Sequence, residues 1–366
     1  MPPAPGGGGV YTQLLVHGLL DSQFVAYAAV LTEKCPSLPN VETLRKGRLD
    51  IYRRFPFRAG VSGRSFVRYF QYLWQNLCFL ALPWMVYRLG ISHLLIHSSF
   101  HNHPNFMWLA VLIIRELLPS VKLISDVRDP KLPESRFGEI KLYHWVICCS
   151  ENVHQRLAKN ASLTNKLVTI PIVIDIDKPS HTEIAECKKR YGLELTPYLF
   201  NGSGISWEKG IAKALDVINQ IRNVQQDLCL VVAGRKRDWS KCHDDAVKSG
   251  ALCYVGIIPH RDVFILSAGA EIDVNFSHVD SMPRATLEAL AAGAKVLLPK
   301  GIPEFDRSCS EYVVASDCSQ EIAKQVQLII SRNEFPNYDM QPHAPASVYR
   351  QYSRLFHRDE VNDVSV

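Results

Sequence analysis

The feature that most constrains the fold is a regular alternation between two kinds of apolar segment. Short runs rich in β-branched residues, such as VKLISDV at 121–127, alternate with longer segments whose apolar residues recur at helical spacing. An example of the longer kind is MWLAVLIIRELL at 107–118. Strands that alternate with helices are typical of βαβ units, which build parallel sheets covered by helices. The chain is therefore predicted to be an α/β protein.

The alternation runs through both halves of the chain and is interrupted once. The break is the polar, proline-containing segment at 178–180, which a charged helical pattern follows. With 366 residues, the chain exceeds the usual size of one domain. We predict two doubly wound domains, at 1–178 and 179–340, and a C-terminal helix and tail at 341–366 that packs back on the first domain. Further strands are expected at 93–100, 144–150, 166–175, 197–202, 228–234, 252–256, 271–276 and 295–299.

Charge and cysteine usage limit the partners. The net charge is +5 and no block of five like charges occurs, so the chain lacks the clustered charge of a dedicated nucleic-acid binder. Ten cysteines are scattered without a C-x-x-C pair or a zinc-like spacing, which indicates reduced thiols and no metal site. The first nine residues lack the features of a signal peptide. We expect a cytoplasmic protein without a cofactor.

Three other segments carry alternative interpretations. The aromatic segment at 64–90 is predicted to be a buried helix, with peripheral contact to a membrane as the alternative. Residues 97–103 hold His97, His101 and His103, for which acceptor binding is a better interpretation than a metal site because no carboxylate completes a ligand set. The basic run at 234–238 fits either a phosphate contact or a solvated loop.

The stretch DSMPRATLE at 280–288 has the features of an anion site. It follows the strand expected at 271–276, and ligands of open α/β sheets bind beyond the carboxyl ends of the strands. Pro283 suits a first helical turn, where the amides after it are free to bind a phosphate. Glu288 falls in the second turn, where its carboxylate can accept two hydrogen bonds from a ribose diol. The residues leave open the alternative that Asp280 is an ordinary turn residue and Glu288 an ordinary helix former.

The same stretch, continued to 297 as DSMPRATLEALAAGAKVL, resembles the signature of retaining GT-B glycosyltransferases, the large family four. In that pattern an acidic residue, seven residues and a glutamate precede a small-residue helix and a strand. Residues 201–218, NGSGISWEKGIAKALDVI, are similar to the strand, glycine turn and Lys-Gly pair that open the family's second domain. The resemblance implies the GT-B fold, in which two Rossmann-like doubly wound domains face a central cleft.

The resemblance also implies a role for each matching position. Glu288 would bind the ribose, Asp280 the transferred sugar, and Lys209 the diphosphate as it departs. Arg128 and Asp129 match a pair that lies near the reacting sugar in the family. The other implied donor-binding positions are two glycine turns, a base contact and the helix-start amides: Gly7, Gly8, Ser203, Gly204, Gly256, Ile257, Ile258, Pro283, Arg284 and Ala285.

Two positions depart from the family pattern. Ser203 stands where an arginine is common, six residues before the lysine, so stabilisation of the leaving group is expected to be weaker unless Arg235 compensates. Asp280 stands where glutamate is more usual and has a shorter reach. The expected function is metal-independent, retaining transfer of a hexose from a nucleotide-diphosphate sugar to a glycan or lipid-linked acceptor, as in polysaccharide biosynthesis. The alternatives are a non-catalytic nucleotide-sugar-binding subunit and a nucleotide-sugar epimerase.

Overall fold

The structure is a computed structural model, and it describes residues 7–33, 41–55, 77, 79–97, 105–128, 137–277, 280–332 and 334–358. Asp129, His101, His103 and most of the predicted helix at 64–90 lie outside these ranges. The chain divides into two compact units. Unit 1 comprises Met1–Val173 and Pro345–Val366, and unit 2 comprises Ile174–Ala344. Within the described residues, no helix is both long enough and apolar enough to cross a membrane.

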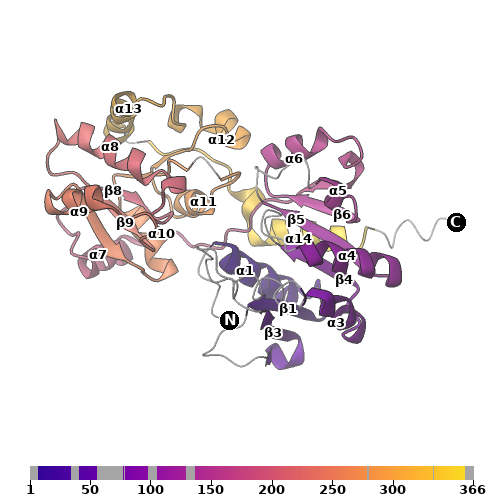
Figure 1. Cartoon of the computed structure of the whole chain (residues 1–366). Helices are drawn as coiled ribbons and strands as arrows, with labels where there is room; N and C mark the ends of the chain where they lie inside the picture. Colours follow the sequence, from indigo (N-terminus) through magenta and orange to yellow (C-terminus); the bar gives the residue numbers. More distant parts are fainter. Residues whose placement is uncertain are drawn as a thin grey trace, which may run out of the picture. The chain divides into compact units, whose positions relative to one another are not determined.

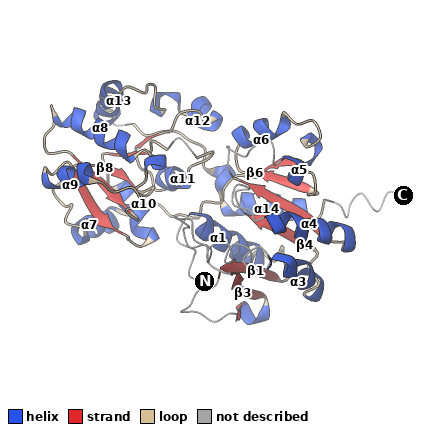
Figure 2. Ribbon diagram, viewed as in Figure 1, coloured by secondary structure: helices blue, strands red, loops and turns tan. Residues whose placement is uncertain are grey.

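Unit 1 contains a parallel sheet of four strands in the order β4-β5-β6-β7. Figure 1 labels β4, β5 and β6 of this sheet, and Figure 2 shows its strands in red. Each strand lies within a segment that was predicted to be a strand, so these predictions are confirmed. The strands are β4 (His93–His97), β5 (Lys122–Val127), β6 (Trp145–Cys148) and β7 (Leu167–Thr169). The connecting helices are α4 (Asn105–Leu117), α5 (Phe137–Ile140) and α6 (Glu151–Ala158). At the start of α6, the Ser150 hydroxyl accepts a hydrogen bond from the Val153 amide, which satisfies one otherwise free helix-start donor.

A second, three-stranded sheet in unit 1 was not indicated by the sequence pattern. In it β3 (Leu49–Phe55) lies between β1 (Ala28–Glu33), with which it is parallel, and β2 (Val41–Leu44), with which it is antiparallel. Helix α1 (Gly7–Asp21) contributes Leu20 to a small core with Val30, Leu49 and Ile51. A short helix, α3 (Leu82–Arg88), follows the turn η2 (Phe79–Ala81).

The C-terminal helix α14 (Pro345–Phe356) belongs to unit 1, where it packs against α1. The hydroxyl groups of Tyr11 and Tyr352 are 2.7 Å apart, and Tyr349 donates a hydrogen bond to the Leu14 carbonyl at 3.1 Å. A Cβ at Gly18 would lie 1.9 Å from the Tyr349 ring. Glycine at position 18 is therefore what allows the two helices to approach this closely.

Unit 2 is built on a five-stranded parallel sheet in the order β10-β9-β8-β11-β12. All five strands lie within predicted segments: β8 (Tyr198–Asn201), β9 (Cys229–Ala233), β10 (Leu252–Gly256), β11 (Ile272–Val274) and β12 (Val296–Leu297). The chain extends the sheet first from β8 to β10 on one side and then from β11 to β12 on the other. The order thus reverses between β8 and β11, and such a reversal is where open α/β sheets bind ligands.

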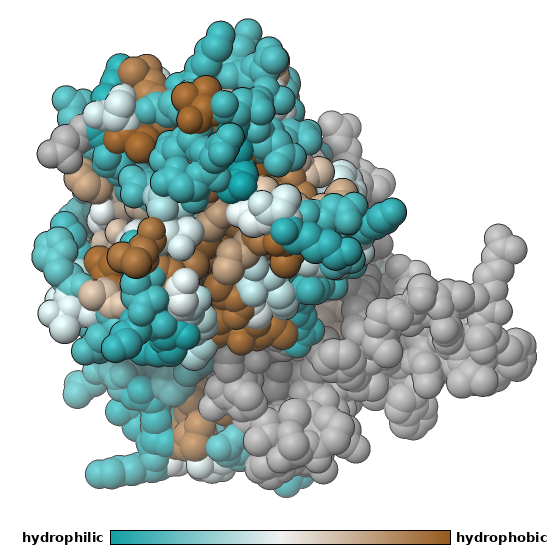
Figure 3. All heavy atoms as spheres, turned by 90° about the vertical axis from the view of Figure 1, so that its left-hand side faces the viewer, coloured by the Kyte–Doolittle hydropathy of each residue, from teal (hydrophilic) through white to brown (hydrophobic). Residues whose placement is uncertain are grey.

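Helices complete unit 2 (Figure 2). Helix α8 buries the predicted apolar positions Ile211, Ala214, Leu215 and Ile218. On the face of the molecule in Figure 3, hydrophilic and hydrophobic side chains are interspersed. The helices of this unit are α7 (His181–Arg190), α8 (Ile211–Arg222), α9 (Lys241–Lys248), α10 (His260–Ala268), α11 (Arg284–Ala291), α12 (Pro303–Ser308) and α13 (Ser319–Ser331).

Candidate functional site

The loops that follow β8 and β9 are joined to each other through their backbones. Ile205 and Lys236 form an isolated parallel bridge, and the Arg237 amide donates to the Ile205 carbonyl at 3.1 Å. A Cβ on Gly234, whose φ is +113°, would lie 3.1 Å from the Gly204 Cα. The two glycine turns therefore form one continuous backbone surface at the carboxyl edge of the sheet.

Gly210 places the neighbouring lysine at the end of β11. Its φ is +72°, and a Cβ there would lie 2.4 Å from the Phe276 carbonyl oxygen, so only glycine fits. The turn η6 (Trp207–Lys209) is thereby held close to the loop after β11. Lys209 Nζ lies 2.7 Å from each carboxylate oxygen of Asp280. The two side chains remain 28% and 23% exposed, so a ligand can reach both.

Helix α11 begins one residue later than predicted. Pro283 is its N-cap, with φ −74° and ψ 112°, and Arg284 is the first helical residue. The first backbone hydrogen bond within the helix runs from the Leu287 amide to the Pro283 carbonyl, 3.2 Å away. The amides of Ala285 and Thr286 precede this bond and lie at the positive end of the helix dipole. This geometry suits an anion, and the binding of a phosphate here stays a prediction.

Glu288, one turn further along α11, is buried with a side-chain exposure of 6%. Arg284 Nε donates to its Oε1 at 2.5 Å, and His260 Nε2 lies 3.0 Å from the same oxygen. Burial raises the pKa of Glu288, but the hydrogen bond from His260 and the charge of Arg284 outweigh burial and hold the pKa below its ordinary value. The carboxylate is therefore ionised at neutral pH.

Two polar residues of β11 and its end were not predicted to be buried. Ser267 donates a hydrogen bond to Asp273 Oδ2 at 2.7 Å, and Asn275 Nδ2 donates to the Thr286 hydroxyl at 2.8 Å. Both faces of a central parallel strand are covered, so its polar residues cannot reach water as they do on a half-exposed strand. Burial raises the pKa of Asp273 to about 7, although the hydrogen bond from Ser267 opposes this rise.

The other predicted donor-binding residues of unit 2 lie in loops at the same edge of the sheet. Ser203 is bound through its hydroxyl to Asn201 Oδ1 at 2.7 Å, and Arg235 is exposed. Gly256, with φ +89°, ends β10, and Ile257 beside it is 73% exposed. The roles of these residues in holding a base or diphosphate remain predictions. His260, which the sequence pattern did not single out, follows this loop directly; only its place after a strand end could have marked it.

Arg128, which was predicted to lie near a reacting sugar, occupies a crowded place in unit 1. Its Nε donates to Asp126 Oδ2 at 3.1 Å, and its guanidinium carbon lies 3.4 Å from the centre of the Tyr11 ring. Gly7 and Gly8 form part of the first turn of α1 in the same unit. Arg128 therefore links β5 to α1, and its proposed role in catalysis stays a prediction.

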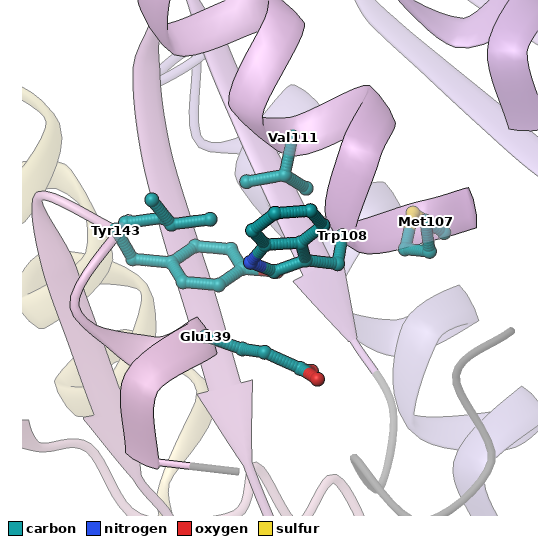
Figure 4. A pocket seen from close by; sticks show the side chains of 6 residues that line it. Met107, Trp108, Val111, Glu139 and Tyr143 are labelled. Atoms are coloured by element: carbon teal, nitrogen blue, oxygen red, sulfur yellow. The ribbon is translucent and has the colours of Figure 1, made fainter. Parts of the chain in front are cut away.

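A pocket elsewhere in unit 1 lies between α4 and the segment around α5 (Figure 4). Its side chains are largely apolar, with Glu139 the charged group among them, so it does not have the cations that an anionic donor needs. It is lined by Met107, Trp108, Val111, Glu139, Leu142 and Tyr143.

Two further predictions concern metal ions and membranes. Across the described ranges there is no group of three or more side chains that could hold a metal ion together.

Helix α3 exposes 55% of Trp84 and 73% of Tyr87, and the guanidinium carbon of Arg88 lies 5.2 Å from the centre of the Trp84 ring. Membrane contact remains a prediction.

Solved structures share this fold, although no family model matches the chain and no curated protein matches its sequence. Sucrose-phosphate synthase from Thermosynechococcus elongatus is similar over 98% of this chain and 94% of its own, with a TM-score of 0.73 and 15% identity. A glycosyltransferase from Rickettsia africae matches over 97% and 96%, with a TM-score of 0.70 and 13% identity. Anabaena HepE, in complex with UDP and glucose, matches over 100% and 97%, with a TM-score of 0.63 and 13% identity.

This chain has the GT-B fold. The similarity spans both units, and the two parallel sheets agree with the predicted fold class, which is thereby confirmed. At identities of 13–15%, the similarity establishes the fold.

Proposed function

We propose that this protein is a retaining glycosyltransferase that moves a hexose from a nucleotide-diphosphate sugar to a glycan or lipid-linked acceptor without a metal ion. The observation that carries the proposal is the contact between Lys209 and Asp280 near the start of α11. It brings a cation, an acceptor of sugar hydroxyl groups and helix-start amides to one edge of the sheet. The fold shared with HepE, which was solved with UDP and glucose, supports the same conclusion.

The hydrogen-bonding capacity of Lys209 fits this role. An ammonium group has three donors, and contacts with the two Asp280 oxygens use two of them. The third donor is left for an oxygen of the departing diphosphate. Asp280 thereby orients Lys209, and its remaining lone pairs can accept hydrogen bonds from hydroxyl groups of the transferred sugar. Charge that develops on the leaving group is stabilised by Lys209 and by the amides of Ala285 and Thr286.

The charges in the site also show how a serine instead of an arginine at position 203 affects the positive charge available to the diphosphate. Lys209 is paired with Asp280, and Arg284 is paired with Glu288, so the two cations are each offset by an acid. A serine at position 203 adds no further positive charge. Exposed Arg235, on the loop after β9, is the cation that we assign to the diphosphate in its place.

The test compares the wild type with Lys209→Met across a panel of nucleotide sugars and glycan acceptors. Removing one donor to a developing anion lowers the rate by about 100-fold, so we expect kcat to fall by about that factor. Lys213→Met is the matched control, because Lys213 is a half-buried lysine of α8 that donates to the Asp317 carbonyl and not to Asp280. NMR of the first product should show the anomeric configuration of the donor, and a chelator should leave the rate unchanged.

The same assay separates the alternatives. An epimerase would convert the donor in the absence of an acceptor. A non-catalytic subunit is the alternative that the missing arginine at position 203 favours. In that case the wild type and Lys209→Met would both bind the nucleotide sugar, and neither protein would transfer or hydrolyse it. Either result with the wild type would overturn the proposed activity.

A further inference from the structure

The carboxylate of Glu288 is held by donors from two different helices. Arg284 lies one turn before it on α11, and His260 is the first residue of α10. A side chain one turn away follows the motion of its own helix, whereas His260 fixes the carboxylate relative to a second element. The His260 ring is itself restrained, because it packs edge-on against Phe264 with ring centres 6.0 Å apart.

The hydrogen on His260 can be assigned from the state of its partner. Burial alone raises the pKa of Glu288, yet the hydrogen bond from His260 and the charge of Arg284 lower it on balance, so Glu288 is an acceptor. His260 Nε2 must then carry the hydrogen and donate it over the 3.0 Å distance. The His260 side chain is 44% exposed, in contrast to 6% for Glu288.

Both donors act on the same oxygen of Glu288. Arg284 and His260 contact Oε1, and no described residue donates a hydrogen bond to Oε2. Oε2 is not among the buried side-chain atoms that lack a hydrogen-bond partner, and the Glu288 side chain as a whole keeps 6% exposure. The carboxylate is therefore fixed through one oxygen and presents the other to a ligand.

We propose that His260 is a positioning residue that, together with Arg284, orients Glu288 so that Oε2 accepts a hydrogen bond from the 2′-hydroxyl of the nucleotide's ribose. This inference rests on the proposed function, since it assumes that a nucleoside diphosphate binds at this edge of unit 2. His260 acts through Glu288 and does not contact the nucleotide. Its effect on affinity should therefore appear only when the ribose hydroxyl is present.

The test is a calorimetric comparison of UDP with 2′-deoxy-UDP, with ADP and GDP and their 2′-deoxy forms measured in parallel. The proteins are wild type, His260→Ala, His260→Gln and Glu288→Ala. Loss of one hydrogen bond to a charged group corresponds to roughly a tenfold change in affinity. We expect His260→Ala to weaken ribonucleotide binding by about that factor and to leave the deoxynucleotide unchanged. His260→Gln, which keeps a donor close to the position of Nε2, should restore ribonucleotide binding to within about twofold.

Arg261→Ala is the control, because Arg261 is adjacent and its ion pair is with Glu183 on α7. Arg261→Ala should leave the affinities for the ribonucleotides and for the deoxynucleotides unchanged. The inference about His260 would be overturned if His260→Ala lost the same affinity for ribo- and deoxynucleotides, or lost affinity for neither. If Glu288→Ala nevertheless bound ribo- and deoxynucleotides equally, the inference about His260 would be wrong but the proposed function would stand. If no nucleoside diphosphate binds to the wild type, both the proposed function and this inference are wrong.

Discussion

Each unit buries an aspartate in a strand of its parallel sheet, and the two units stabilise these acids differently. In unit 1, Asp126 of β5 is completely buried and accepts a hydrogen bond from Arg128, which lies against the Tyr11 ring. In unit 2, Asp273 of β11 receives a hydrogen bond from the uncharged hydroxyl of Ser267. Asp273 has a pKa raised to about 7 by burial, so it is largely protonated in mildly acidic solution.

The difference indicates where each unit uses charge. In unit 1 a charged pair lies within the packing of α1, α14 and β5, where removing one partner leaves a buried charge without compensation. In unit 2, two ion pairs, Lys209 with Asp280 and Arg284 with Glu288, lie at the carboxyl edge of the sheet. We infer that the pair in unit 1 serves the packing of the chain ends, and that those in unit 2 serve a ligand.

The largest effect is expected from Arg128→Met. Loss of one member of a buried ion pair costs about 3–5 kcal/mol, and unit 1 should lose that much stability. Hydrogen exchange of peptides from β5 and α14 measures this change separately from unit 2. Arg354→Met, on the exposed side of α14, is the control and should have little effect. Unchanged exchange together with lost activity would instead favour the predicted role of Arg128 near the reacting sugar.

A smaller, pH-dependent effect is expected from Asp273→Asn. The folded protein retains the proton of Asp273 up to a pKa of about 7, whereas the unfolded chain loses it near its ordinary value. The stability that Asp273 provides is therefore complete below its ordinary pKa and is lost progressively as the pH rises from there to about 7. Between pH 5 and 8, the stability of the variant relative to wild type should rise by about 2–3 kcal/mol.

Hydrogen exchange of unit 2 at the two pH values measures this difference. Asp227→Asn, at an exposed position, is the control and should show no such trend. A relative stability that does not depend on pH would show that Asp273 is ionised in the fold and compensated in another way.

The smallest change in stability is expected at the carboxyl edge of the sheet in unit 2, where we propose that the ligand binds. Lys209→Met and Asp280→Asn break a partly exposed pair, which stabilises a protein by less than about 1 kcal/mol. Thermal unfolding should therefore shift little in either variant, even where activity falls. A loss as large as that expected for Arg128→Met would show that this pair, too, serves the fold, and the comparison between the units would fail.

The sequence predicted the strands of the two large sheets because their short apolar runs are rich in β-branched residues and alternate with helical patterns. It did not predict α1, whose first turn contains Gly7, Gly8 and Gly9, residues that disfavour a helix. The packing of Tyr349 over Gly18 and the contact of Tyr11 with Tyr352 stabilise that helix despite its composition. Strand β3 was also missed, because the charged residues of LDIYRRF break an apolar run.

By itself, the sequence determined which segments form the two parallel sheets, which loops carry Lys209 and Asp280, and which helix start carries Glu288. Parallel strands place all those loops at one edge, so the region of the candidate site followed from local patterns. Only the tertiary structure decided the partners. Lys209 and Asp280 are 71 residues apart, and His260 is 28 residues from Glu288. No local propensity links such residues, because their contact depends on how the strands and helices between them pack.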